Sequence, residues 1–128
     1  MSSDRRTFLA GAALSAAIAT GATGNTGVAV VSRYGLIGKM EAKPGRRADL
    51  ARILLDGVSG MLGCLSYIVA EDPSHPDTLW ITEAWISRDA HAASLSLPSV
   101  RAAIAKGRPL IAGMTAIAET VPIGGHGL

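Results

Sequence analysis

The sequence is poor in cysteine, in aromatic residues and in clustered charge. Its one cysteine, Cys64, excludes a disulfide within the chain. Aromatic residues make up only 4% of the 128 residues, and the formal net charge is +2, with no basic run longer than a pair such as Arg46-Arg47. Proteins that bind nucleic acid usually combine a basic patch with aromatic side chains. We therefore expect no nucleic-acid partner.

Hydrophobic residues are plentiful by comparison. They make up 48% of the chain, against 17% for charged residues. At this length, that composition is typical of one globular domain with a substantial apolar core. We expect the domain at residues 28–122 and a disordered, glycine-rich tail at residues 123–128.

The first 27 residues differ in composition from the rest. The pair Arg5-Arg6 is followed by Thr-Phe-Leu and by a weakly hydrophobic stretch rich in alanine and glycine. This pattern resembles a twin-arginine export signal, which implies a bacterial or archaeal source and a periplasmic or extracellular destination. A disordered tail is the alternative. Because glycine and threonine interrupt the stretch, we expect no stable membrane anchor.

Hydrophobic periodicity and turn residues divide the expected domain into strands and helices. We expect strands at 32–42, 64–71, 78–86 and 113–121, and helices at 46–61, from about 87 to 97, and at 98–106. Ser87 and Ser96 are placed to cap the last two helices. This order is that of a ferredoxin-like β-α-β-β-α-β sandwich of the α+β class.

Such a sandwich has helices on only one face of its sheet. Several of the expected strands also carry apolar side chains on the other face, and a monomer would expose them to water. A two-fold dimer that packs two sheets against each other would bury them. We therefore expect a homodimer.

The stretch from Leu79 to His91 is the richest in chemically informative side chains. Alternation along a strand places Leu79, Ile81, Glu83 and Trp85 on one face and Trp80, Thr82, Ala84 and Ile86 on the other. Since both faces are largely apolar, Glu83 is expected to be buried. A buried carboxylate is unusual and makes this strand the first candidate for a site.

Short motifs along the chain resemble the antibiotic biosynthesis monooxygenase family, whose members belong to the dimeric α+β barrel superfamily. The matching residues are Pro44-Gly45, the run from Gly63 to Tyr67, Asp72-Pro73, Glu83-Ala84-Trp85 and Ala90-His91. The resemblance implies a dimeric α+β barrel. It also implies a quinol or phenol monooxygenase that uses dioxygen and a small aromatic substrate, and that needs no metal, flavin or other cofactor.

The resemblance implies roles for five side chains. Such chemistry needs an apolar pocket for a flat ring and a polar group that removes a proton from it. His91 is the candidate base, and Glu83 would orient the imidazole or a substrate hydroxyl. Trp85, Tyr67 and Trp80 are the candidate ring contacts. The structural alternatives are a core or dimer-interface position for Trp85 and Trp80, a hydrogen bond to a partner strand for Glu83, and a surface or core position for His91.

The same resemblance leaves alternatives open, because this superfamily hosts many functions. They are a non-catalytic dimeric module that binds a ligand or is associated with stress, and a lactone isomerase-like enzyme. Many family members have a histidine nine positions after the strand tryptophan, where this chain has Ser94. Haem-degrading relatives use groups that Ser94 and Ile104 cannot replace, so haem degradation is disfavoured.

Overall fold

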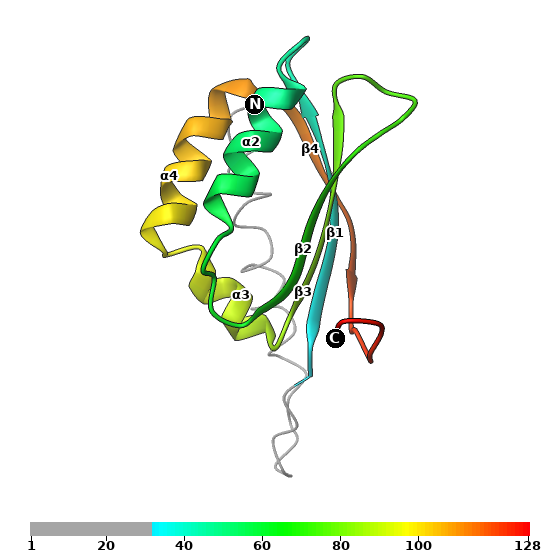
Figure 1. Ribbon diagram of the computed structural model, residues 1–128, viewed down its shortest axis with the longest axis vertical. Coiled ribbons are helices and arrows are strands. Elements are labelled where there is room, and N and C mark those ends of the chain that lie inside the picture. The colour runs from blue at the N-terminus through cyan, green and yellow to red at the C-terminus, as the bar shows by residue number, and fades with distance from the viewer. Residues whose placement is uncertain (1–31) are drawn as a thin grey trace.

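A computed structural model describes residues 32–128. The expected export signal at residues 1–27 lies outside them. Four strands form one antiparallel sheet in the order β2-β3-β1-β4, and three α-helices cover one face of it (Figure 1). The elements are β1 (Tyr34–Ala42), α2 (Arg47–Gly57), β2 (Cys64–Glu71), β3 (Thr78–Trp85), α3 (Arg88–Ser94), α4 (Pro98–Gly107), the short 3-10 helix η1 (Arg108–Leu110) and β4 (Ile111–Thr120). The expected α+β, ferredoxin-like fold is confirmed.

Strands β2 and β3 form the expected hairpin. The Arg47 guanidinium at the start of α2 donates hydrogen bonds to the carbonyls of Asp72 and His75, at 3.1 and 3.0 Å, and so ties the turn of the hairpin to the helix layer. Glu83 in β3 is paired with Tyr67 of β2 on one side and Leu36 of β1 on the other. Glu83 therefore lies in the interior of the sheet.

The helices follow the predicted pattern with two corrections. Ser87 caps α3, and its hydroxyl accepts a hydrogen bond from the Ala90 amide at 3.0 Å, as expected. Ser96 does not cap α4, because the N-cap is Leu97 and no side chain caps that end; Pro98 opens the helix instead. Helix α2 ends at Gly57 rather than at residue 61.

Close packing of α2 against α4 accounts for a glycine at the end of α2. A Cβ at Gly57 would lie 2.5 Å from the Cβ of Ala103, so any larger residue would push the two helices apart. After Gly57 the chain leaves the helix, and Met61 in the following loop turns back into the core with only 9% of its surface exposed. Through Met61, the loop between α2 and β2 thus contributes to the core between the helices and the sheet.

The sheet face opposite the helices remains uncovered by the described residues. One row across all four strands joins Ile68, Thr82, Ile37 and Ala118. Ile68 is 55% exposed. We term this surface the open face, and the side chains of this row are apolar or uncharged, as in faces that pack sheet on sheet. In the described part of the chain, no helix has the length and hydrophobicity needed to span a membrane.

Candidate active site

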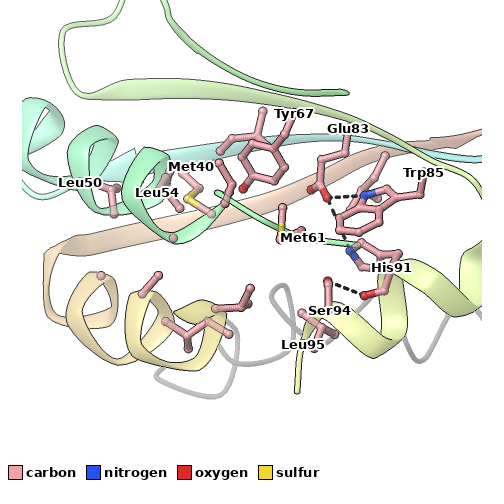
Figure 2. A pocket seen from close by; sticks show the side chains of 18 of the residues that line it. Met40, Leu50, Leu54, Met61, Tyr67, Glu83, Trp85, His91, Ser94 and Leu95 are labelled. Carbon is pink, nitrogen blue, oxygen red and sulfur yellow. Dashed lines mark hydrogen bonds and ion pairs between the residues drawn. The ribbon is translucent and has the colours of Figure 1, made fainter. Parts of the chain in front are cut away.

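A cavity of about 70 Å³ lies between the sheet and the helix layer. Strands β1, β2 and β3 line it from one side, and α2, α3 and α4 line it from the other (Figure 2). Most of its lining side chains are apolar. The polar side chains among them are Tyr67, Glu83, His91 and Ser94, with the indole N–H of Trp85. This combination of an apolar wall with a few convergent polar groups is typical of a small-molecule site.

Glu83, Trp85 and His91 form the polar end of the cavity. The Trp85 Nε1–H donates a hydrogen bond to Glu83 Oε1 at 2.9 Å, and His91 Nε2 lies 3.6 Å from the same oxygen (Figure 2). The side chains of Glu83 and His91 are only 8% and 6% exposed. Strand alternation brings Glu83 and Trp85 to one face. Helix α3, which begins after the Ser87 cap, brings His91 to them.

The His91 imidazole is held by two aromatic rings. Its centroid lies 5.2 Å from that of Trp85, edge to face, and 5.3 Å from that of Tyr34. Tyr34 is fixed in turn, since its hydroxyl donates a 2.7 Å hydrogen bond to Glu119 and the Arg88 guanidinium lies over its ring. Among the described residues, His91 Nδ1 is buried without a hydrogen-bond partner.

Burial inverts the usual order of proton affinity in the Glu83–His91 pair. Desolvation raises the pKa of Glu83 to about 7, although the Trp85 N–H opposes the shift. Desolvation also lowers the pKa of His91 to about 4, against the opposing charge of Glu119. At neutral pH the imidazole is therefore uncharged, and the carboxyl group is the member of the pair that gains and loses a proton.

This inversion predicts how stability changes with pH. Between pH 4.5 and 6.5 the unfolded chain carries one proton on His91 and the folded chain carries one on Glu83, so the two contributions cancel. In Glu83→Gln, only the depressed pKa of His91 remains, and stability should rise from pH 4 to 6.5. In His91→Phe, only the raised pKa of Glu83 remains, and stability should fall from pH 4.5 to 7. Each change should reach about 3 kcal/mol.

Urea denaturation of the three proteins at half-unit pH steps measures these slopes. Because other groups titrate in all three proteins, the quantity to compare is the difference in unfolding free energy between each variant and the wild type. If the unfolding free energies of all three proteins changed with pH in the same way, the inverted order of the Glu83 and His91 pKa values would be contradicted.

The structure brings together four of the five side chains that the sequence singled out. Glu83, Trp85, His91 and Tyr67 all line the cavity. Trp80 lies on the other side of the sheet, where its Nε1–H donates to Asp72 at 2.8 Å and Lys39 lies over its ring. Strand alternation already separated Trp80 from Trp85, so Trp80 cannot contact a ligand in this cavity.

Some residues in or beside the site were not assigned a role from the sequence. Tyr34 supports His91, and Met40 and Met61 form apolar walls. Alternation in the first expected strand could have placed Tyr34 and Met40 on the helix side, but nothing in the sequence indicated that Tyr34 pairs with Trp85. Met61 was expected in a helix and reaches the cavity from a loop.

Metal-ligating residues do not gather in the described part of the chain: no three His, Cys, Asp or Glu side chains come close enough together to hold an ion. Cys64 is half-buried beside this site, and burial raises the pKa of its thiol. It is therefore not an activated nucleophile at neutral pH.

Fold and site define a small α+β protein with a buried acid–imidazole pair in an apolar cavity. The sequence profile of the family described as antibiotic biosynthesis monooxygenase matches residues 33–106. The chain belongs to this family.

Solved structures agree with this assignment. A candidate antibiotic biosynthesis monooxygenase from Chloroflexus aurantiacus is 63% identical, with a TM-score of 0.73 over 74% of this chain and 97% of that one. Similar proteins from Caulobacter crescentus (19% identity, TM-score 0.67, 73% and 92% covered) and Nitrosomonas europaea (11% identity, TM-score 0.66, 75% and 95% covered) share the fold. No curated protein matches the chain.

Proposed function

We propose that this protein is a cofactor-independent monooxygenase that oxidises a small aromatic quinol or phenol with dioxygen. Family membership supports a monooxygenase-type fold. The observation that carries the proposal is the buried Glu83–His91 pair, since its carboxyl group has a pKa of about 7 and lies in an otherwise apolar cavity. A general base works best when its pKa lies near the operating pH.

In the proposed reaction, Glu83 accepts the proton of a substrate hydroxyl. The His91 imidazole is neutral at this pH, and its Nε2 lies 3.6 Å from Glu83 Oε1. It stabilises the Glu83 carboxyl group once that group has accepted the proton. The electron-rich anion of the ring then passes an electron to dioxygen, and the two radicals combine. With 1,4-hydroquinone, one oxygen atom enters the ring and the other leaves as water, which gives hydroxy-1,4-benzoquinone. We therefore assign the role of the general base to Glu83, in place of His91, which the sequence analysis had named as the candidate.

Oxygen uptake tests this function. The protein incubated with 1,4-hydroquinone should consume one dioxygen per quinol, at a rate proportional to protein concentration and above autoxidation. Uptake that does not exceed autoxidation for any quinol or phenol would contradict the proposal. If a ligand nevertheless bound to the cavity, a non-catalytic module would be favoured, whereas turnover of a lactone without oxygen would favour an isomerase.

We also propose that the open face forms a homodimer with a second copy. Its central row is apolar or uncharged, and Ile37 occupies β1, an inner strand of the sheet. Sedimentation at micromolar concentration should give a dimer for the wild type and a monomer for Ile37→Lys, because a buried, unpaired ammonium group is costly. Leu62→Lys is the matched control, since Leu62 is 84% exposed and lies in the loop between α2 and β2, outside this row. A monomeric wild type would rule out this dimer.

A further inference from the structure

We propose that the cavity accepts a single aromatic ring and excludes fused rings. Met61 sets this limit, and the Tyr67 hydroxyl binds the oxygen substituent opposite Glu83. This inference rests on the proposed function and narrows its substrate class to single-ring compounds of the 1,4-hydroquinone type.

The size limit follows from the volume and the walls. An engineered cavity of roughly 150 Å³ binds benzene, and this one measures about 70 Å³. Even one ring must therefore displace side chains. The helices leave no slack where α2 meets α4, since a Cβ at Gly57 would already lie 2.5 Å from Ala103. A second, fused ring would need roughly twice the displacement.

Met61 is the lining side chain best placed to move. It lies in the loop between α2 and β2, whereas Met40 on the opposite wall belongs to the inner strand β1 and is 1% exposed. An unbranched thioether side chain adopts many conformations at low cost. Val58, the other loop residue on this wall, is β-branched and stiffer. Movement of Met61 can admit one ring, and its bulk is what excludes a second.

Two polar groups of the cavity can each bind one oxygen of a ring. Glu83 and Tyr67 are direct partners on neighbouring strands. In Figure 2 the Glu83 carboxylate points towards Trp85 and His91, while the Tyr67 ring leans towards Met40. The Tyr67 hydroxyl makes no hydrogen bond with other described residues, and burial raises its pKa, so it remains a donor. A ring with oxygens at positions 1 and 4 can satisfy Glu83 and Tyr67 at once.

Binding measured without oxygen separates this inference from the proposed reaction. Anaerobic calorimetry with the full chain would compare 1,4-hydroquinone, 4-methylphenol and 1,4-naphthalenediol. The wild type should bind 1,4-naphthalenediol at least about tenfold more weakly than 1,4-hydroquinone, and Met61→Ala should recover that loss. Tyr67→Phe should weaken 1,4-hydroquinone about tenfold and leave 4-methylphenol unchanged, because that ligand has no second oxygen.

The comparison of the three ligands on the wild type needs no variant, so misfolding of a variant cannot affect the measured difference in affinity. Equal affinity for one and two rings, or no binding of 1,4-hydroquinone at millimolar concentration, would overturn the inference. So would an equal effect of Tyr67→Phe on 1,4-hydroquinone and 4-methylphenol. Selective binding of one ring without any oxygen uptake would uphold the inference and reject the monooxygenase reaction.

Discussion

Replacing Glu83 by glutamine should lower the rate of oxygen uptake with 1,4-hydroquinone at least a hundredfold at pH 7.5. The amide has the shape of the carboxyl group and can still accept the 2.9 Å hydrogen bond from Trp85. It cannot accept the substrate proton, and proton transfer by a well-placed base typically contributes a factor of about 10² to 10⁴. In the wild type, the rate should rise with pH and level off above the pKa of Glu83, about 7.

Glu71→Gln provides the matched control. Glu71 lies in β2, the strand that pairs with the strand of Glu83, but its side chain is 63% exposed and outside the cavity. The rate of oxygen uptake by Glu71→Gln should stay within a factor of two of the wild-type rate. Glu83→Gln also removes the cost of burying a carboxylate, so it should be no less stable at pH 7.5, and lost activity cannot be ascribed to unfolding. A Glu83→Gln rate near that of the wild type would exclude Glu83 as the base.

The fold was predictable because its signals are local. Alternation in residues 78–86 and the proline and aspartate residues of the preceding turn, 72–77, indicate strands and a hairpin without knowledge of tertiary contacts. Ser87 before a helical stretch is a cap wherever the helix packs. The glycine at the end of α2 is different, because the residue that leaves no room for a side chain there is Ala103, 46 positions further along the chain (103 minus 57).

The site was predictable only in part, for the same reason. Alternation placed Glu83 beside Trp85 and predicted that Glu83 is buried, and both predictions are confirmed. Proton affinity depends on burial from every side, so the low pKa of His91 could not be derived from its residue type. Tyr34 supports His91 only because β1 pairs with β3, and this long-range pairing has no short-range signature.

Trp85→Ala should destabilise the protein by about 3 to 5 kcal/mol, the range observed when a large buried aromatic side chain is removed. Trp85 is 1% exposed and joins Tyr34, Leu36 and Met61 in one of the two core clusters. A domain of this size is stable by only about 5 to 15 kcal/mol. The variant should therefore unfold at much lower urea concentration, or not fold at all.

Ile86→Ala provides the matched control, because Ile86 directly follows Trp85 and is 50% exposed. Its loss of stability should stay below about 1 kcal/mol. The more conservative Trp85→Phe separates packing from hydrogen bonding, since it keeps a ring but removes the N–H that donates to Glu83. Without that donor the pKa of Glu83 should rise further, and the pH at which activity levels off should rise with it. Equal stability losses for Trp85→Ala and Ile86→Ala would show that Trp85 is not a core residue, and the cavity would then have no fixed wall against which His91 could be held.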